Sequence, residues 1–356
     1  MHINSIDIFC EVIDNFGDVG FSYRLARELF NRYNKKVKIR LIIDKDSEFK
    51  KISGGMEREI SVITYEELIS QKKHIEASDI VIETFGCNVP KKYLNKSYEN
   101  SKLIINIEYF SAQDWIDDFH LKESIIPNSK VKKIFYMPGL SDKSGGVIID
   151  NNFLKTINKI QLNKEFYMKK YGIDDGKYDL IGTIFSYEKD FSKFLYDLSK
   201  TKKKTLLFIL SEKTQKNFNI YFDNNNYYDT IDFVKSPFYS YNEYEELISL
   251  VDFNLVRGED SFVRALILGK PFLWHIYPQE KNIHMGKLKS FLEKYNCDEK
   301  LKDIFISYNN SYNEDYRYFF ENLNKIEMFN KDFSEYLIKN NNLIEKIYEY
   351  IKNLGG

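Results

Sequence analysis

Apolar residues near the start of the chain first alternate as in a strand and then recur as in a helix. Residues 6–13 alternate apolar and polar positions, and apolar residues between 21 and 33 repeat at about the helical spacing of 3.6. Residues 37–43 form a second strand-like run that ends at Asp44. Strand, helix and strand in this order predict a βαβ unit. Its first loop lies at the carboxyl end of a strand, where open α/β sheets bind ligands.

The alternation of strands and helices continues along most of the chain. Further strands are predicted at residues 80–85, 103–110, 133–137, 178–187, 205–210, 230–234, 253–256 and 272–277, and helices at 190–198 and 241–250. Turn residues at Pro138-Gly139 and Ser144-Gly145-Gly146 interrupt the pattern between the two halves. We therefore predict an α/β protein of two Rossmann-like domains, residues 1–155 and 156–329. The mainly helical end of the chain, about 330–356, is able to pack back on the first domain.

The loop after the first strand, Asp14-Asn15-Phe16-Gly17-Asp18-Val19-Gly20, carries two carboxylates. Its glycines are three positions apart, and the glycine that would precede them in a GxGxxG motif is missing. The loop therefore does not support a nicotinamide-dinucleotide site. An aspartate in a turn or at a helix N-cap is common, so Asp14 or Asp18 alone is more often structural. Two such residues around Asn-Phe-Gly favour a functional loop.

The stretch Arg257-Gly258-Glu259-Asp260-Ser261-Phe262-Val263-Arg264 follows an apolar run and leads into 265–268, which Gly269 ends. This pattern predicts a buried strand, a one-glycine turn and a short helix. A helix N-terminus beside two arginines suits an anionic group such as a diphosphate. Glu259 and Asp260 would repel a phosphate if both pointed at it. An N-cap explains one acidic residue, but it does not explain Arg257 together with the acidic pair.

Composition and charge exclude several classes of protein. The chain has 356 residues, 43% of them hydrophobic and 29% charged, which is typical of a globular protein. Its 52 basic and 53 acidic residues nearly cancel, so no strong field favours nucleic acid or an anionic membrane. No apolar stretch approaches the roughly 20 residues that span a bilayer. With no leader pattern at the N-terminus, we expect a cytoplasmic protein without a membrane partner.

Cysteine and histidine patterns do not indicate a metal site. The three cysteines, Cys10, Cys87 and Cys297, are isolated, and the five histidines form no HExxH spacing. Cys10 and Cys87 lie in or beside apolar runs, so we expect buried thiols there. We predict neither a metal ion nor a cofactor.

Several blocks of the sequence together resemble one family, EarP, the bacterial protein-arginine rhamnosyltransferases that act on translation elongation factor P. The blocks are 14–20, Asn106-Ile107-Glu108-Tyr109-Phe110-Ser111-Ala112-Gln113-Asp114-Trp115, Pro138-Gly139, Gly145-Gly146, Phe185-Ser186-Tyr187-Glu188, Phe238, 257–264 and Trp274-His275-Ile276-Tyr277-Pro278-Gln279. They run in the family's order over most of the chain, up to a position near residue 295. The C-terminal residues beyond carry no matching motif.

The resemblance implies a fold, a reaction and a set of site residues. It implies an inverting GT-B glycosyltransferase, with two domains facing each other across a cleft, that moves rhamnose from dTDP-β-L-rhamnose to an arginine of elongation factor P without a metal. By resemblance, Asp18, Asp14 and Glu259 are catalytic. The implied donor-binding residues are Asn15, Phe16, Gly17, Tyr187, Phe238, Arg257, Gly258, Asp260, Ser261, Phe262, Tyr277 and Gln279. One position departs: this chain has Tyr241 where the family usually has glutamine, which implies rearranged base recognition.

This chemistry agrees with the residue types. A guanidinium is a poor nucleophile because its lone pairs are delocalised and it stays protonated. A carboxylate pair can hold it bidentately and accept a proton as the new bond forms. Alternatives are a GT-B transferase for another nucleotide sugar or acceptor, and a non-catalytic module that binds elongation factor P. A nicotinamide oxidoreductase ranks last.

Overall fold

The computed structural model describes residues 2–13, 16–53, 60–70, 76–222, 229–311 and 315–354. The chain divides into two compact units, which are considered separately below. Unit 1 comprises Met1–Asp150 with Leu337–Gly356, and unit 2 comprises Asn151–Tyr336. The sequence placed the first boundary near residue 155, and the division falls at Asp150, directly before a helix.

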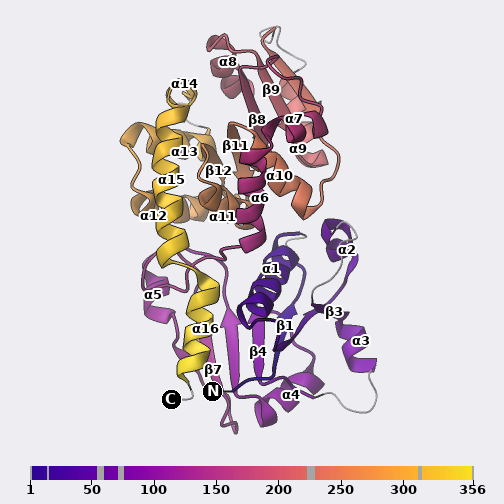
Figure 1. Ribbon diagram of the computed structural model, residues 1–356. Helices are drawn as coiled ribbons and strands as arrows, with labels where there is room; N and C mark the ends of the chain where they lie inside the picture. Colours follow the sequence, from indigo (N-terminus) through magenta and orange to yellow (C-terminus); the bar gives the residue numbers. More distant parts are fainter. Residues whose placement is uncertain are drawn as a thin grey trace. The chain divides into compact units, whose positions relative to one another are not determined.

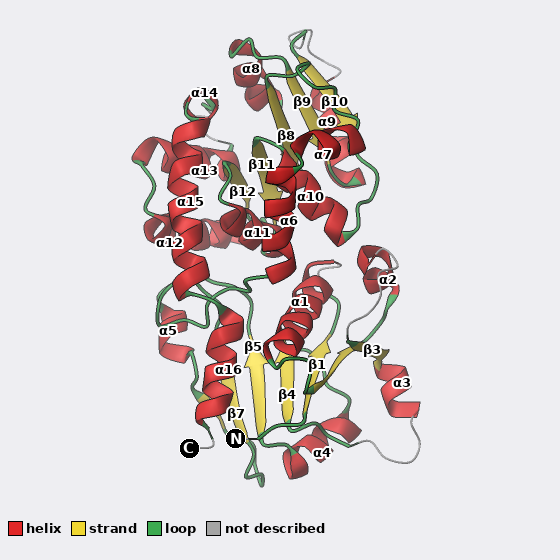
Figure 2. Ribbon diagram, in the orientation of Figure 1, coloured by secondary structure: helices red, strands yellow, loops and turns green. Residues whose placement is uncertain are grey.

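Unit 1 is built on a seven-stranded sheet in the order β3-β2-β1-β4-β5-β7-β6 (Figure 2). The strands are β1 (Ser5–Cys10), β2 (Lys38–Ile43), β3 (Ser61–Thr64), β4 (Ile80–Thr84), β5 (Leu103–Ile107), β6 (Glu123–Ser124) and β7 (Lys132–Tyr136). All pairs are parallel except β6 with β7. The chain builds the sheet outward from β1 in one direction and then from β4 in the other. The gap between the carboxyl ends of β1 and β4 is therefore the topological switch point.

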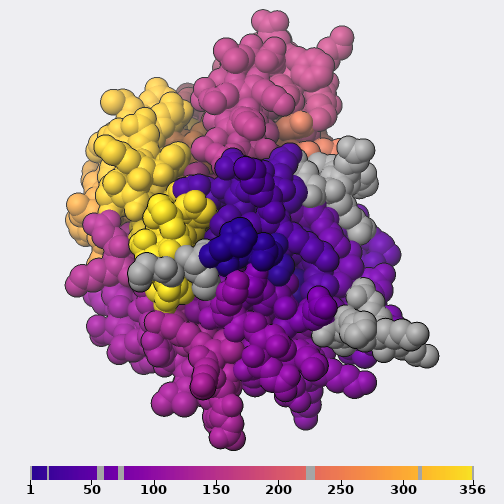
Figure 3. All heavy atoms as spheres, turned by 60° about the horizontal axis from the view of Figure 1, so that its bottom comes forward, coloured from indigo at the N-terminus to yellow at the C-terminus, as the bar shows by residue number. Residues whose placement is uncertain are grey.

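Helices cover both faces of this sheet (Figure 1). They are α1 (Phe16–Arg32), α2 (Ser47–Ser53), α3 (Tyr65–Ser70), α4 (Lys91–Asn100), α5 (Trp115–Phe119) and α16 (Leu343–Asn353). One face packs on α3 and α4 through a cluster that includes Phe9, Leu68 and Tyr93. On the other face α1 lies beside α16, where Arg32 pairs with Glu345 at 2.7 Å. Figure 3 shows the C-terminal residues, in yellow, against the N-terminal residues, in indigo.

The glycine-rich turn at 144–146 holds the C-terminal segment in place. Val147 forms a parallel bridge with Asn342, and the Val147 N–H donates to the Asn341 carbonyl at 2.9 Å. Gly146 has φ +76°, and a Cβ there would lie 2.3 Å from the Asn341 carbonyl oxygen. Only glycine allows this close approach. The turn residues that interrupt the sequence pattern therefore have a structural role.

Unit 2 has a five-stranded, fully parallel sheet in the order β10-β9-β8-β11-β12. The strands are β8 (Leu180–Ile184), β9 (Thr205–Ile209), β10 (Ile231–Lys235), β11 (Phe253–Arg257) and β12 (Phe272–His275). This order repeats that of the first five strands of unit 1, so a second switch point lies between the carboxyl ends of β8 and β11. The helices are α6 (Asn151–Leu162), α7 (Lys164–Lys170), α8 (Ser192–Lys200), α9 (Glu212–Phe222), α10 (Tyr241–Leu250), α11 (Asp260–Leu268), α12 (Ile283–Tyr295), α13 (Glu299–Asn310) and α14 (Arg317–Glu321), with a short 3-10 turn, η1 (Glu280–Asn282). The long helix α15 (Leu323–Asn340) also starts in unit 2, and its residues from Leu337 onward belong to unit 1.

The core of unit 2 combines aliphatic and aromatic side chains. On one face, α6 and α10 pack on the sheet through Ile160, Phe208 and Leu247. In another part of the core, the rings of Phe194, Phe253 and Phe320 contact one another. Much of the aromatic content of the sequence is therefore core, as expected from its frequency.

Candidate active site

The first candidate region lies at the switch point of unit 1, where α1 begins. Asp18 is the third residue of α1 and is 3% exposed. Its Oδ2 accepts a hydrogen bond from the Ile13 N–H at 3.0 Å, and its Oδ1 accepts one from the Tyr109 hydroxyl at 3.5 Å. These bonds hold the carboxylate in one orientation, at a helix N-terminus that favours negative charge. Phe16 and Gly17 form the start of α1, while Asp14 and Asn15 lie outside the described residues.

An aromatic pair stands next to Asp18. The rings of Phe85 and Tyr109 stack at a centroid distance of 4.3 Å and an interplanar angle of 11°. Phe85 has φ +58°, an uncommon value for a bulky residue, and its N–H donates to the Ile107 carbonyl at 2.7 Å. Tyr109 is 37% exposed. A flat aromatic surface beside a carboxylate is suited to a guanidinium, which stacks on rings as well as pairing with charge.

Two further acidic residues near these strand ends, Glu83 and Glu108, have structural partners. Glu83 pairs with Lys133 at 2.6 Å, and Glu108 accepts a hydrogen bond from the Asn106 side chain at 2.7 Å. Phe85 was missed because its positive φ has no signature in the sequence, which predicts it as the last residue of a strand; β4 ends one residue earlier.

The second candidate region lies at the switch point of unit 2. As predicted, a strand (β11), a turn at Gly258 with φ +65° and a short helix (α11) follow one another, and Gly269 ends the helix with φ +72°. The Val263 N–H donates to the Glu259 carbonyl at 3.0 Å, which starts the helical ladder. The Ser261 hydroxyl donates to the Arg257 carbonyl, and the Trp274 indole N–H donates to the Gly258 carbonyl at 2.7 Å. Two side chains therefore fix the turn from which the helix N–H groups project.

The donor residues predicted in this turn contribute in different ways. The Phe262 side chain is fully buried and stacks on Trp274 at 3.9 Å, so only its backbone N–H can serve a ligand. Glu259 occupies the N-cap position of α11 and is partly exposed. Asp260 pairs with Arg264 at 3.3 Å. Arg264 is 4% exposed, so the second arginine of the stretch is buried instead of standing beside the turn.

Arg257 is held against aromatic rings. Its guanidinium carbon lies 4.3 Å from the centroid of Phe185 and 5.0 Å from that of Tyr187, and its Nη1 donates to the Ser186 carbonyl at 3.2 Å. Tyr187 in turn contacts Tyr277, with centroids 5.3 Å apart. The cation is therefore preorganised at the end of β11, next to the helix N-terminus. A planar cation and a helix N-terminus together suit a diphosphate.

Three of the predicted donor-binding residues outside the Arg257 turn have exposed side chains. Phe238 is 57% exposed and Tyr277 is 60% exposed. Gln279 is also exposed, and its N–H donates to Nδ1 of His284 at 3.0 Å. Tyr241, the departure from the family pattern, begins α10, and its ring lies 4.6 Å from the guanidinium carbon of Arg264. This departure therefore affects the packing around Arg264.

His275 is a buried neighbour of the Arg257 turn and contacts Ser186, whose carbonyl binds Arg257. It is buried at the end of β12, and its Nδ1 lies 2.7 Å from the Ser186 hydroxyl. Burial, with the charges of Lys189 and Arg257 nearby, lowers the pKa of His275 to about 3. The imidazole is therefore neutral at physiological pH and adds no charge beside Arg257. The resemblance block contained His275, but nothing in the sequence indicated that it is buried.

A sequence profile described as "Elongation-Factor P (EF-P) rhamnosyltransferase EarP" matches residues 6–352. The chain belongs to this family. A protein-arginine rhamnosyltransferase of Pseudomonas putida is 30% identical over 82% of this chain and 81% of its own length. One from Neisseria meningitidis serogroup B is 32% identical over 81% of this chain and 78% of its own. The family predicted from the sequence is confirmed, and with it the expectation that the chain belongs to an enzyme family.

The solved structures confirm the predicted fold class, α/β of the GT-B type with two Rossmann-like domains. An EarP structure, described as the "structural basis for EarP-mediated arginine glycosylation of translation elongation factor EF-P", matches with a TM-score of 0.63 at 18% identity. It covers 98% of this chain and 99% of the EarP chain. MurG of Acinetobacter baumannii matches with a TM-score of 0.52 at 9% identity, over 99% of this chain and 100% of MurG.

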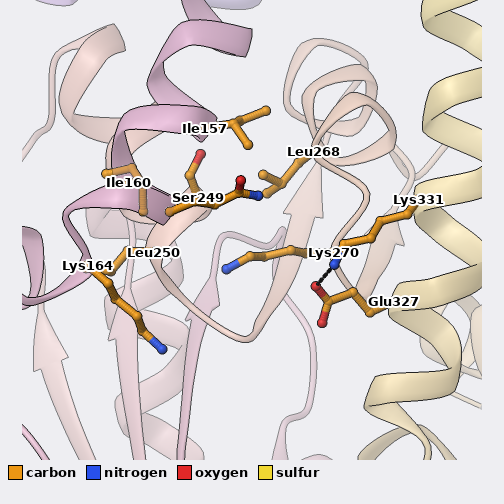
Figure 4. Close-up of a pocket in the computed structure, with 10 residues that line it drawn as sticks. Ile157, Ile160, Lys164, Ser249, Leu250, Leu268, Lys270, Glu327 and Lys331 are labelled. Atoms are coloured by element: carbon orange, nitrogen blue, oxygen red, sulfur yellow. Dashed lines mark ion pairs between the residues drawn. The ribbon is translucent and has the colours of Figure 1, made fainter.

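A small cavity of about 90 Å³ lies at the opposite end of β11 and α11 from Arg257 in this EarP family member (Figure 4). Lys270 projects into it and donates to the Val251 carbonyl at 2.5 Å, at the C-terminal end of α10. Lys331 pairs with Glu327 at 2.7 Å. Both lysines therefore have internal partners, and burial lowers the pKa of Lys270 to about 8. The cavity is therefore a gap between the ends of α10 and α11 and the start of α7, and these two lysines are not available to a ligand as free cations.

The part of the chain that the structure describes contains neither a candidate membrane-spanning helix nor a candidate metal site. No helix there combines the length and the apolar character that crossing a bilayer requires. Within the same residues, no group of three or more His, Cys, Asp or Glu side chains is arranged to hold a metal ion.

Proposed function

We propose that this chain transfers rhamnose from dTDP-β-L-rhamnose to an arginine side chain of translation elongation factor P, with inversion at the anomeric carbon. One observation carries the proposal. In a member of the EarP family, a buried, oriented carboxylate lies at one switch point, and an arginine beside a helix N-terminus lies at the other. The first suits a guanidinium acceptor and the second suits a diphosphate donor. We further propose that unit 1 serves the acceptor and unit 2 the donor, in the cytoplasm.

On the acceptor side, Asp18 accepts the proton that the guanidinium must lose. The acceptor arginine stacks on the Phe85–Tyr109 pair while Asp18, together with Asp14, holds its fork. A guanidinium nitrogen then attacks the anomeric carbon as the bond from that carbon to the diphosphate oxygen breaks. The nitrogen's proton passes to the carboxylate, and the electrons of the broken bond remain on the diphosphate. A single displacement of this kind inverts the anomeric centre.

On the donor side, the leaving diphosphate gathers negative charge. The N–H groups of Ser261 and Phe262 and the guanidinium of Arg257 stabilise that charge, so the proposal needs neither a metal ion nor a cofactor. Glu259 acts as the third catalytic carboxylate, on the sugar side. The exposed rings of Phe238 and Tyr277, with Tyr187, hold the nucleoside. Asn15, Phe16, Gly17, Gly258, Asp260 and Gln279 complete the proposed contacts to the donor.

The decisive experiment measures the intact mass of elongation factor P after incubation with the protein and dTDP-β-L-rhamnose. The expected result is a gain of one deoxyhexose on a single arginine, with no gain when the Asp18→Asn variant is used. Parallel incubations with UDP- and GDP-sugars test the alternative donors. Binding of elongation factor P without any mass change would favour the non-catalytic module.

A further inference from the structure

Arg264 is buried between two carboxylates and two aromatic rings. Its Nη2 lies 3.3 Å from Oδ2 of Asp260, and its Nε lies 3.5 Å from Oε1 of Glu245. The rings of Tyr241 and Tyr244 lie 4.6 and 5.4 Å from its guanidinium carbon. All of these partners except Asp260 come from α10. The side chain is therefore held between one face of α10 and Asp260, the first residue of α11.

The sequence explains how α10 forms this cradle. Tyr241, Tyr244 and Glu245 are spaced i, i+3 and i+4, so they share one face of the helix. The start of α10 is fixed by a capping box, in which Ser240 and Glu243 each bond the other's backbone. Asp260 and Arg264 are likewise four residues apart on α11. Two short helices thus converge on one cation, and that cation reaches the first residue of α11.

This arrangement resolves a conflict of charge at the proposed donor site. Asp260 begins the helix whose N-terminus is proposed to receive a diphosphate, and a carboxylate there would repel that ligand. Arg264 offsets this charge from the buried side, leaving Arg257 for the ligand. A buried ion pair is a weak source of stability, because desolvation cancels much of its attraction. A role in positioning accounts better for so many partners around one arginine.

We propose that Arg264 is a positioning residue for donor binding: it orients and neutralises the Asp260 carboxylate at the N-terminus of α11, so that this turn accepts a nucleoside diphosphate. The inference rests on the proposed function of unit 2 as the donor domain. Arg264 does not touch the ligand itself, and it acts through Asp260. Its loss therefore changes how the donor binds and leaves the acceptor site unaffected.

The test is a double-mutant cycle read by calorimetric titration with dTDP. Arg264→Gln should weaken dTDP binding by about tenfold or more, because it leaves the charge of Asp260 uncompensated beside the diphosphate. Asp260→Asn should weaken binding less, because it removes that charge together with the proposed contact to the donor. The double variant should bind no more weakly than the worse single variant, because Arg264 has nothing to position once the carboxylate is gone. Arg264→Gln should also raise the KM for the donor and leave the KM for elongation factor P unchanged. A merely structural role would move neither KM selectively.

Two further variants keep the test decisive if Arg264→Gln folds poorly. Arg264→Lys keeps the charge but loses the planar fork that reaches Asp260 and Glu245 together, so it should also weaken dTDP binding. Arg264→Gln with Glu245→Gln restores the charge balance of the cluster, so it should recover stability without recovering dTDP affinity. Unchanged affinity in a folded Arg264 variant, or purely additive losses in the cycle, would overturn the inference. A wild-type protein that binds UDP or GDP in place of dTDP would overturn the donor assignment, and the same cycle would then be run with that nucleotide.

Discussion

At the scale of single residues, Asp18 has two kinds of role that a substitution can separate. Its Oδ2 accepts a hydrogen bond from the Ile13 N–H, which ties α1 to Ile13, and its carboxylate is proposed to accept a proton. Asparagine preserves a carbonyl oxygen for the hydrogen bond but cannot serve as a base. If Asp18 is only structural, Asp18→Asn should keep rhamnosyl transfer; if Asp18 is a base, the same variant should lose it.

The variant Asp18→Asn should lose rhamnosyl transfer by at least about 100-fold, the usual contribution of a general base. Its dTDP affinity should stay the same, because the residues proposed to bind the diphosphate and the nucleoside lie in unit 2. Asp44→Asn is the matched control, since Asp44 accepts the neighbouring Val12 N–H at 2.9 Å. The control should keep turnover within about twofold. Near-normal turnover by a folded Asp18→Asn protein would show that the carboxylate is not catalytic.

A substitution at Arg257 can show whether its positive charge alone is enough to bind the diphosphate. Arg257→Lys keeps the positive charge but loses the planar contact with Phe185 and Tyr187 and the bidentate geometry. We expect dTDP binding, measured by calorimetry, to weaken by about tenfold. Arg24→Lys, a conservative change in α1 of unit 1, should leave it unchanged. Equal affinity in the Arg257→Lys protein and the wild type would mean that the guanidinium geometry is irrelevant.

At the scale of elements, the sequence predicted regular segments better than the residues between them. Hydrophobic patterns located β1, α1, β11 and α11, because apolar residues fill most of the buried positions of each element. It extended β5 to residue 110 and β8 to residue 187, whereas these strands end at Ile107 and Ile184. The extra residues include Tyr109 and Tyr187, apolar-looking loop residues that belong to the candidate site.

Other features could not be predicted because they depend on contacts between distant segments. The i, i+4 spacing of Asp260 and Arg264 is visible in the sequence, but the approach of Glu245 from another helix is not. The two-residue strand β6 is too short to show any period. The positive φ at Phe85 has no sequence signal.

The glycine-rich turn at 144–146, which holds the C-terminal segment through Asn341 and Asn342, gives a prediction about stability. Gly146→Ala should destabilise unit 1 by about 3 kcal/mol or more, because a Cβ 2.3 Å from the Asn341 carbonyl must displace that segment. Gly86→Ala is the control, since Gly86 also has positive φ, +64°, but a Cβ there has no atom within 4 Å. The control should lose only about 1 kcal/mol from backbone strain. Equal losses in denaturant unfolding would show that strain alone accounts for both.

At the scale of the whole molecule, both units share one order of parallel strands, but the side chains at the two switch points differ in charge. The shared strand order places the ends of β1 and β4 together in unit 1, and those of β8 and β11 together in unit 2. The first carries a carboxylate and aromatic rings, and the second carries a cation and a helix N-terminus. Each unit also contains one of the two tryptophans, Trp115 and Trp274, so the unfolding of each unit can be followed separately.

Many buried groups that ionise in alkali should set the response of the protein to high pH. Burial raises the pKa of all three thiols, Cys10, Cys87 and Cys297, from 9.0 to about 12. In the unfolded chain these thiols titrate near their ordinary pKa. Between about pH 9 and 12 the folded state therefore holds more protons than the unfolded state, and stability falls as pH rises. Burial of tyrosines such as Tyr136 raises their pKa and acts in the same direction.

Lys270 acts in the opposite direction. Burial lowers its pKa from 10.5 to about 8, with Asp252 and Glu327 opposing this shift and Lys164 and Lys331 adding to it. Between about pH 8 and 10.5 the unfolded state holds the extra proton, so this one group adds stability as pH rises. Three thiols and several tyrosines outweigh a single lysine. Above pH 9 the net change should be a loss.

We therefore expect the free energy of unfolding to fall between pH 9 and 11 by at least about 1.4 kcal/mol, the equivalent of one pKa unit for one group. Denaturant unfolding followed by tryptophan fluorescence measures this, with Trp115→Phe and Trp274→Phe isolating each unit in turn. Lys270→Met is the matched control. Its stability relative to the wild type should decline from pH 8 to 10.5, because only the wild type gains stability from deprotonating Lys270. A flat or rising profile above pH 9 would contradict the assignment of buried, protonated thiols and tyrosines to both cores.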